Sequence, residues 1–386
     1  MKGFLTGAAV AAAAAVLAIL GFEVLLRGIG YSAPTWHQPN ARLGWILRPG
    51  VGGWFSKEGR AFVEINAIGA RDLEHDVEKP RNVYRIAVLG DSFSEAMQVA
   101  REQAYWALLP ERLRACGFQP GKRIEVLNFG VSGYNSAQQY VMLKSTAMRY
   151  RPDLVLLQFS NGNDVRENHY ALSQEKGRPF FRLEPDGGLR LDESFASTSS
   201  FRQRQSMMFE AARKLSDHSR VFQLVRDARR AVLAWLVTEA HAADFERGLD
   251  TVVLAPPREP VWDEAWRITE GAVARMHGYA KSRRARFMVM TVSSSMQVHP
   301  DPRRCAALQA KLGVSDLFYP DNRIAALARK RGFEAVTVAR VLQPVAEQTG
   351  IYFHGFENAI LGRGHWNAAG HSAAADLVAL RLCNKG

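Results

Sequence analysis

The 386-residue chain contains few cysteines and lacks the usual sequence patterns of metal and nucleotide binding. Its three cysteines, Cys116, Cys305 and Cys383, lie far apart and form no CxxC pair, so they indicate neither a disulfide framework nor a metal site. One pair could still form, although we expect at least two of the three to be buried, inert thiols. The first predicted strand is followed by neither a GxGxxG motif nor a P-loop lysine, which disfavours a nucleotide-binding fold. We predict no cofactor and no metal.

Acidic residues are also fewer than basic ones, 38 against 50, and the formal net charge is +12. Solvated helix faces account for most basic runs, such as residues 226–230 and 281–286, and attraction to anionic lipid head groups or an acidic polymer is the alternative. The chain has no zinc-finger spacing, no heptads and no aromatic–basic RNA signature. We therefore expect no nucleic-acid partner. With 47% hydrophobic residues, the chain can bury a full α/β core and still hold extra modules.

The N-terminal segment is the one long stretch without charge. Residues 4–22 are rich in Ala and Leu and nearly reach the roughly 20 residues that a bilayer-spanning helix requires. A cleaved signal peptide has a shorter apolar region of about 7–15 residues followed by small residues, whereas here the alanines come first. We therefore predict that residues 1–30 are an uncleaved membrane anchor. Lys2 and Arg27 leave the orientation open, and a periplasmic or other extracytoplasmic location of the remaining chain is our preferred topology.

The remaining chain divides into a lead-in segment and an α/β domain. Residues 31–81 are rich in Gly, Pro and Trp, contain a strand-like stretch at 60–65, and carry no recognisable chemistry. Residues 82–386 show the alternation of strands and helices that is typical of an α/β domain. An insertion at about residues 171–266 breaks this alternation with a hairpin and with amphipathic helices at 201–215 and 221–239, and we interpret it as a lid or substrate platform. The five predicted strands lie near residues 85–89, 124–127, 154–159, 286–293 and 334–338.

Polar blocks follow the first three predicted strands, at the sheet edge where ligands bind in open α/β folds. The blocks contain Asp91-Ser92, Gly133 and Asn163-Asp164. The Ser92 hydroxyl can project above the sheet, and its amide lies near the positive end of the following helix. Gly133 can offer a closely approaching N–H and Asn163 a side-chain amide, so three donors could converge on one oxyanion. Taken singly, a helix-capping serine, a turn glycine and a turn asparagine are the alternatives.

A serine nucleophile needs a base, and the C-terminal region supplies the candidates. His365 opens a helix-forming run after the fifth strand, where it would face the same sheet edge. His371 lies six residues further on, and we expect it to pack or cap instead. His354 and His299 are weaker candidates.

Together these blocks resemble the SGNH (GDSL-type) hydrolase family. The matching residues are Gly90-Asp91-Ser92, Gly133, Asn163-Asp164 and His365 with Asn367, Gly370 and His371. The resemblance implies a flavodoxin-like three-layer α/β/α sandwich with five parallel strands. It implies Ser92 as nucleophile, His365 as base, and an oxyanion hole made by Ser92, Gly133 and Asn163. Asp91, Asp164 and Asn367 take supporting positions, and such proteins cleave or transfer esters through an acyl-serine intermediate.

The chain departs from the family at one position. The aspartate that normally precedes the catalytic histidine by two or three residues is replaced here by Arg363 and Gly362. Three hypotheses follow: a Ser92–His365 dyad, a replacement acid from elsewhere such as Glu357, or a site that has lost hydrolysis.

We therefore predict a membrane-anchored serine esterase. It would act on acyl esters, mainly O-acetyl esters, of a cell-envelope glycan or lipid. An O-acyltransferase and a catalytically impaired polysaccharide-binding protein are the alternatives.

Overall fold

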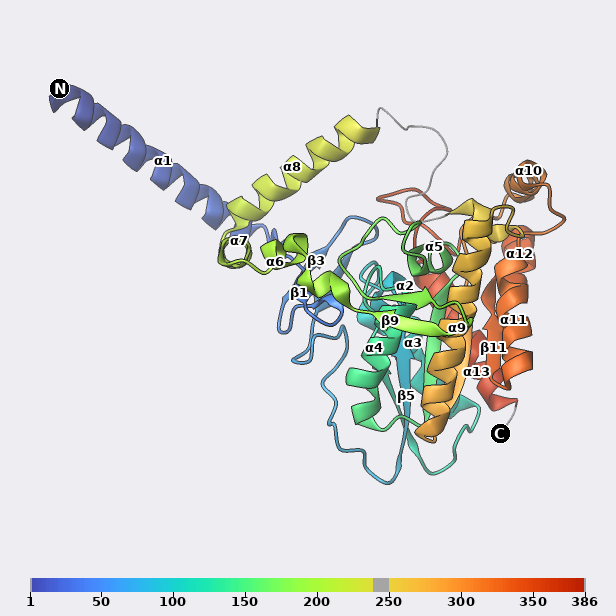
Figure 1. The fold of residues 1–386 in the computed structure, drawn as a ribbon. Coiled ribbons are helices and arrows are strands. Elements are labelled where there is room, and N and C mark those ends of the chain that lie inside the picture. Colours follow the sequence, from blue (N-terminus) through green and yellow to red (C-terminus); the bar gives the residue numbers. More distant parts are fainter. Residues whose placement is uncertain (1, 239–249, 385–386) are drawn as a thin grey trace.

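The computed structural model describes residues 2–238 and 250–384, and its centre is a five-stranded parallel sheet (Figure 1). The strands lie in the spatial order β6-β5-β7-β10-β11, which is the flavodoxin-like order 2-1-3-4-5 and confirms the predicted fold class. The direction of strand succession reverses at β5, and ligands bind beside such a reversal, outside the carboxyl ends of the strands. The strands are β5 (Val83–Leu89), β6 (Arg123–Asn128), β7 (Leu154–Ser160), β10 (Arg286–Val292) and β11 (Glu334–Thr337).

Helices cover both faces of this sheet and form the outer layers of the sandwich (Figure 1). Successive side chains of a strand point to opposite faces, so Ala87 of β5 joins one apolar cluster and Ile86 joins the other. The helices α4 (Ser136–Ser145), α9 (Pro260–Ser282) and α11 (Tyr319–Arg331) pack on the Ala87 side. The helices α3 (Tyr105–Ala115), α12 (Val338–Thr349) and α13 (Ala368–Cys383) pack on the Ile86 side. The domain also contains the short helices α2 (Ser92–Glu95) and α5 (Asp164–Asn168), and the longer α10 (Pro302–Leu312).

The lead-in segment forms two small antiparallel hairpins that pack against the α/β domain. The hairpins pair β1 (His37–Asn40) with β2 (Gly44–Leu47), and β3 (Gly52–Phe55) with β4 (Ala61–Glu64). The fully buried side chains of Leu47 and Val63 belong to the main apolar core. Trp45 Nε1 donates a hydrogen bond of 3.0 Å to the Ser132 carbonyl, in the loop that follows β6. The lead-in is therefore in direct contact with the sheet edge where we expect the site.

The insertion contains the predicted hairpin and a set of helices. The hairpin pairs β8 (Phe180–Leu183) with β9 (Leu189–Asp192), and the helices are α6 (Ser199–Arg204), α7 (Met207–His218) and α8 (Arg220–Thr238). The single helix that we predicted at 201–215 is wrong, because Ser206 has an extended backbone and separates α6 from α7. The second predicted helix, 221–239, corresponds to α8, except that Glu239 lies outside the described residues.

The N-terminal helix α1 (Lys2–Gly28) projects away from the body (Figure 1). Its segment Phe4–Gly28 has a mean hydropathy of 2.4 and is long and apolar enough to cross a membrane. The charged residues near its end bind the insertion: Glu23 accepts hydrogen bonds of 2.9 and 3.0 Å from the Arg220 and Val221 amides. Arg27 donates a bond of 2.6 Å to the His218 carbonyl. α1 thus meets the body where α7 ends and α8 begins.

Two of the three cysteines form a disulfide, which corrects the expectation that at least two are inert thiols. The bond joins Cys116, just after α3, to Cys383, the last residue of α13. These two helices pack against each other on one face of the sheet, so their ends lie close enough for the bond. Cys305 is a buried free thiol.

Removing this disulfide should destabilise the fold. The bond closes a sequence separation of 267 residues, and losing such a cross-link typically costs about 2–4 kcal/mol of unfolding free energy. Urea unfolding of the Cys116→Ser/Cys383→Ser double variant, with and without reductant, measures this loss. Reductant should destabilise the wild type and leave the double variant unchanged; equal midpoints in all four samples would contradict the expectation.

Candidate active site

Ser92 and His365 are in direct contact although 273 positions separate them. Ser92 is the first residue of α2, directly after β5, and its Oγ lies 2.8 Å from His365 Nε2. The Asp91 side chain caps α2 by accepting the Phe93 amide proton, so the alternative of a capping role for the Ser92 side chain is wrong. His365 lies in the loop before α13. The structure therefore brings together the predicted nucleophile and the predicted base.

The acid that orients His365 comes from the lead-in segment. Glu58 lies between β3 and β4, and its Oε2 is 2.6 Å from His365 Nδ1. Its other oxygen accepts the His365 backbone N–H, also at 2.6 Å. A carboxylate can only accept here, so Nδ1 carries the proton and Nε2 is free to accept the Ser92 hydroxyl proton.

Glu58 corrects two sequence-based expectations. The replacement acid is not Glu357, which is exposed, and the lead-in segment does carry chemistry. Gly364 is the one local signal of this arrangement. Its φ is +80°, and a Cβ at this position would overlap the Glu58 carboxylate, so a glycine beside the histidine leaves room for an acid from another part of the chain.

The electrostatics of the pair suit proton transfer. Burial by itself would raise the pKa of Glu58, but its hydrogen bonds with His365 and the charge of that imidazole outweigh burial, so the pKa lies below its usual value. Glu58 is therefore an anion at neutral pH and can stabilise the imidazolium that forms when His365 accepts a proton.

A network of buried polar groups holds the histidine loop in place. His354 Nδ1 donates to the Gly364 carbonyl at 2.7 Å, and its Nε2 lies 2.9 Å from Ser293 Oγ. The Asn367 side chain caps α13 by accepting two backbone N–H groups and donates to the Tyr352 carbonyl at 2.7 Å. These hydrogen bonds tie the start of α13 to the segment around Tyr352.

Among the residues that the structure describes, none of the other candidate histidines forms a hydrogen bond with Ser92. His371 is buried and its ring stacks on that of Tyr105, with ring centres 6.1 Å apart. His299 Nδ1 accepts the Asp301 amide proton at 3.0 Å. His371 therefore packs, as expected, and His354 and His299 contribute to loop structure.

The three predicted oxyanion donors follow three adjacent strands. Ser92, Gly133 and Asn163 come after β5, β6 and β7, which are hydrogen-bonded neighbours with the same direction. Among the described residues, no hydrogen bond uses the Ser92 amide, the Gly133 amide or the Asn163 side chain. Gly133 has φ +76°, which favours glycine. These donors are available for a ligand, and their convergence on one oxyanion stays a prediction.

Two buried carboxyl groups support the same sheet edge. Asp91 Oδ1 accepts the Phe93 amide proton at 3.0 Å, and Asp164 Oδ2 accepts that of Ser160 at 2.8 Å. Burial raises the pKa of both groups, and the charge of Asp91 raises that of Asp164 further. They shape the turns after β5 and β7.

A buried arginine from the insertion supports Gly133. Arg178 Nη1 donates a hydrogen bond of 2.5 Å to the Gly133 carbonyl. The same guanidinium binds the Glu167 carboxylate and, at 2.9 Å, the Ser173 hydroxyl. On the neighbouring residue, the Ser132 amide donates to the buried Glu95 carboxylate, which also lies 3.2 Å from His37 Nε2. Sequence reasoning missed these residues, because no motif marks their spacing.

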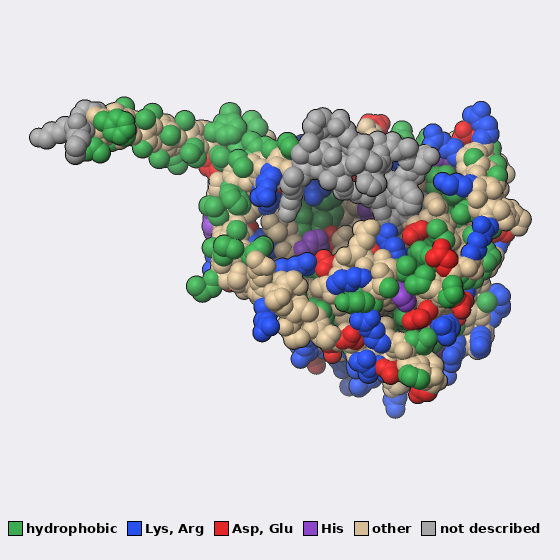
Figure 2. Space-filling view, turned by 45° about the horizontal axis from the view of Figure 1, so that its top comes forward, with side chains coloured by type: hydrophobic (Ala, Val, Ile, Leu, Met, Phe, Trp, Pro, Cys, Tyr) green, Lys and Arg blue, Asp and Glu red, His purple; other side chains and the backbone are tan. Residues whose placement is uncertain are grey.

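A cavity of about 520 Å³ opens beside Ser92 and His365. The lead-in provides much of its lining, including Trp36 and Trp54, and α8 contributes Arg226 and Asp227. Figure 2 shows a hollow on one face of the molecule in which histidine side chains are visible. Within residues 2–238 and 250–384, no group of three or more His, Cys, Asp or Glu side chains could hold a metal ion.

Comparison with known proteins gives only distant similarities. No family model matches the chain, and no curated protein matches its sequence. Among solved structures, an alpha/beta hydrolase enzyme from the metagenome of Lake Arreo is 13% identical, with a TM-score of 0.40, over 78% of this chain and 95% of that one. A catalytic mutant of an acetylxylan esterase from Geobacillus stearothermophilus is 14% identical, with a TM-score of 0.39, over 79% and 96%.

Glu58→Gln should slow the reaction of Ser92 because it removes the negative charge and keeps the side-chain size. Replacing the acid of such a triad by its amide costs about 10²- to 10⁴-fold in rate. The rate at which an alkyl fluorophosphonate labels Ser92, followed by mass spectrometry, measures the effect without assuming a substrate. Glu357→Gln, at an exposed glutamate, is the matched control and should react like the wild type. Equal labelling rates for Glu58→Gln and wild type would show that Glu58 has no role.

Buried histidines should reduce stability as the pH falls. Burial lowers the pKa of His354 from 6.5 to about 4 and, with the charge of Arg71, that of His371 to about 3. Between pH 6.5 and 4 the unfolded chain therefore binds more protons at these positions than the folded protein, and the histidines lower the free energy of unfolding.

Urea unfolding of wild type and His371→Gln between pH 7 and 4.5 tests this expectation. The raised pKa values of Asp91 and Asp164 change the stability in the opposite direction on acidification. Both carboxyls are present in wild type and in His371→Gln, so the difference in pH dependence between these two proteins reports the titration of His371. His371→Gln should show the weaker loss of stability on acidification, and His218→Gln, at an exposed histidine, should follow the wild type. Identical pH dependence in all three would refute the assignment.

Proposed function

We propose that the protein is a membrane-anchored serine ester hydrolase of the SGNH type. The observation that carries this proposal is the continuous chain of contacts Glu58–His365–Ser92, with distances of 2.6 and 2.8 Å, beside an open cavity. A serine hydroxyl becomes a useful nucleophile when a base accepts its proton and an acid orients that base. These contacts join a nucleophile, a base and an acid without the aspartate that the family usually has.

The reaction proceeds in two halves. His365 Nε2 takes the Ser92 proton as Oγ attacks the ester carbonyl carbon, and Glu58 stabilises the resulting imidazolium. The amides of Ser92 and Gly133 and the side chain of Asn163 stabilise the oxyanion. The imidazolium then protonates the leaving alcohol, and an acyl-Ser92 ester remains. Water, deprotonated by His365, releases the acid and regenerates the hydroxyl.

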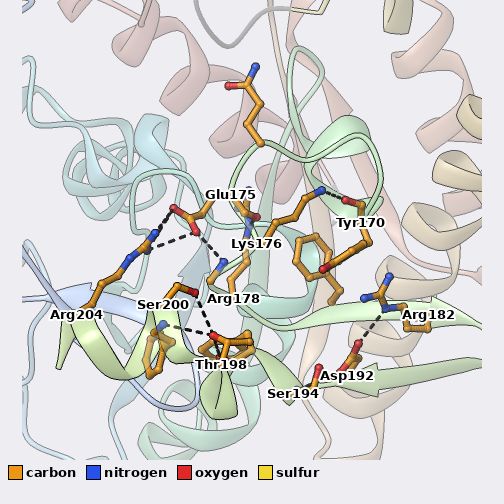
Figure 3. A pocket seen from close by; sticks show the side chains of 15 residues that line it. Tyr170, Glu175, Lys176, Arg178, Arg182, Asp192, Ser194, Thr198, Ser200 and Arg204 are labelled. Atoms are coloured by element: carbon orange, nitrogen blue, oxygen red, sulfur yellow. Dashed lines mark hydrogen bonds and ion pairs between the residues drawn. The ribbon is translucent and has the colours of Figure 1, made fainter. Parts of the chain in front are cut away.

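A second cavity, of about 290 Å³, favours a glycan as the alcohol part of the substrate (Figure 3). The insertion lines it with aromatic rings and with guanidinium and ammonium groups. The Arg182 guanidinium lies 3.8 Å from the centre of the half-exposed Tyr170 ring, and Lys176 Nζ lies 4.5 Å from it. Aromatic faces beside charged hydrogen-bond donors suit sugar rings. Arg178 lines this cavity and also binds the Gly133 carbonyl, so it connects the cavity with a predicted oxyanion donor.

The location follows from two features. α1 has the length and composition of a bilayer span, and its end is bound by the insertion through Glu23 and Arg27. Disulfides persist mainly outside the cytoplasm, so the Cys116–Cys383 bond favours an extracytoplasmic domain. We therefore propose that the substrate is an acylated glycan or lipid of the cell envelope, with O-acetyl esters preferred.

An O-acyltransferase is the second candidate function. It would use the same acyl-Ser92 intermediate and pass the acyl group to a sugar hydroxyl instead of water. The second cavity could hold that acceptor. The complete Glu58–His365–Ser92 contacts disfavour a catalytically impaired binding protein.

Ser92→Ala should abolish hydrolysis of p-nitrophenyl acetate by the full chain in detergent, with a loss of more than about 10³-fold. Ser282→Ala, at the exposed last residue of α9, is the control and should retain the wild-type rate. Longer acyl esters compared in the same assay define the acyl length.

If the wild type is no faster than Ser92→Ala, simple hydrolysis is excluded. An acetyl mass increase on Ser92 that disappears on adding an oligosaccharide would then establish transfer. No acetylation at all would overturn both catalytic candidates.

A further inference from the structure

The helix α7 exposes its apolar side. Met208, Ala211, Ala212 and Leu215 recur at positions i, i+3, i+4 and i+7, so they form one stripe along the helix. All four are exposed, with 69% of Met208 and 51% of Leu215 accessible. The preceding Met207 is 86% exposed. A surface helix normally turns such a stripe towards the core, and here it faces outwards.

Polar contacts fix this orientation. Asp217, on the other side of α7, accepts two hydrogen bonds from Arg48 of the lead-in, at 2.8 and 2.5 Å. Ser216 is buried, and its carbonyl accepts a bond of 2.5 Å from Gln223 of α8. The body therefore holds α7 by its polar side, and turning the stripe inwards would break these contacts.

The stripe lies beside the membrane-spanning candidate. Arg27 of α1 binds the last residue of α7, His218, through its carbonyl. Figure 1 looks along the axis of α7, whereas α1 runs across the view, so α7 lies transverse to α1 at its base. Figure 2 shows hydrophobic side chains continuing from α1 onto the adjoining part of the body. A helix that crosses the direction of a spanning helix at its end is placed along the membrane surface.

The charge around α7 fits an anionic surface. α7 itself has Arg213 and Lys214 against two acidic residues, and the basic excess comes from Arg202, Arg204 and Arg220 on its two flanks, of which Arg204 lies 3.4 Å from Glu175. One of the acidic residues, Asp217, is paired with Arg48, and the other, Glu210, lies 3.4 Å from Lys214. Amphipathic helices lie in the head-group region with their apolar side towards the acyl chains, and basic groups beside them are attracted to an anionic leaflet.

We propose that α7 lies in the head-group region of the bilayer that α1 spans, with its apolar stripe towards the acyl chains of an anionic leaflet. This inference rests on the membrane anchoring given under Proposed function and is independent of the chemistry. It also positions the active site: Ser216 Oγ accepts a hydrogen bond of 2.6 Å from Arg226, and Arg226 lines the catalytic cavity. The cavity is thereby held at a set position relative to the membrane surface.

Site-specific labelling of the full chain in nanodiscs tests the proposal. Met208→Cys or Leu215→Cys is labelled with the fluorophore NBD, in discs of phosphatidylcholine and phosphatidylglycerol that carry a doxyl quencher on the acyl chain. Leu17→Cys in α1 is the control for a spanning position. Leu380→Cys on α13, also exposed, is the control for a position away from the membrane. Two native cysteines are disulfide-bonded and the third is buried, so the new thiol is the reactive one.

We expect the labels at 208 and 215 to be quenched at least threefold more than the label at 380. In discs without phosphatidylglycerol, the quenching at 208 and 215 should be weaker than in discs that contain it. Quenching at 17 together with values at 208 and 215 equal to that at 380 would overturn the inference and leave the anchor intact. If the label at 17 also escapes quenching, the anchor and the inference both fail. Bismaleimide cross-linking of two copies of the Met208→Cys variant, without quenching, would make the stripe a dimer interface and also overturn the proposal. Ester hydrolysis measured on the same discs reports the catalytic proposal separately.

Discussion

The contact between Glu58 and His365 is the interaction on which the active-site geometry depends. One carboxylate binds both the ring Nδ1 and the backbone N–H of the same histidine, so it sets the tautomer, the ring orientation and the position of the loop together. The loop between β3 and β4 that carries Glu58 is held by Asn358, whose side chain accepts the Gly59 amide proton at 2.9 Å and donates to the Gly59 carbonyl at 2.8 Å. The position of the His365 loop is therefore tied to correct packing of the lead-in segment.

The lead-in and the insertion together support the loop that follows β6. Trp45 binds the Ser132 carbonyl, and Tyr134 Oη donates to the Trp45 carbonyl at 2.7 Å. From the other segment, Arg178 binds the Gly133 carbonyl. A predicted oxyanion donor thus lies between contacts from two added segments. Oxyanion donors must be placed precisely because they act on charge that develops in the transition state. The lead-in and the insertion therefore contribute to the candidate site as well as covering it.

The junction of α1, α7 and α8 links the site to the membrane-spanning candidate. Glu23 and Arg27 of α1 satisfy free backbone groups at the start of α8 and the end of α7. α8 in turn contributes Arg226 to the cavity beside Ser92 and His365. A chain of polar contacts therefore runs from the base of α1 to this cavity, so the insertion contacts both α1 and the candidate site.

The sequence by itself determined the fold class, and it indicated the candidate nucleophile, the candidate base and the predicted oxyanion donors. Buried parallel strands are continuous apolar runs, and the residues after them meet at one sheet edge, so Ser92, Gly133 and Asn163 could be placed from local patterns. His365 could be paired with Ser92 because it follows the last strand. Glu58 could not, since nothing around residue 58 marks a catalytic acid, and the missing aspartate left a dyad, a replacement acid and a loss of hydrolysis all open.

Only the tertiary structure brought Glu58 to His365, Arg178 to Gly133, and Cys116 to Cys383. The outward orientation of the α7 stripe is of the same kind, because amphipathic periodicity gives a helix two sides without saying which side meets the body. A local sequence pattern indicates only which helix or strand a residue belongs to. Contacts between elements far apart in the chain depend on how those elements pack, and packing is a property of the whole fold.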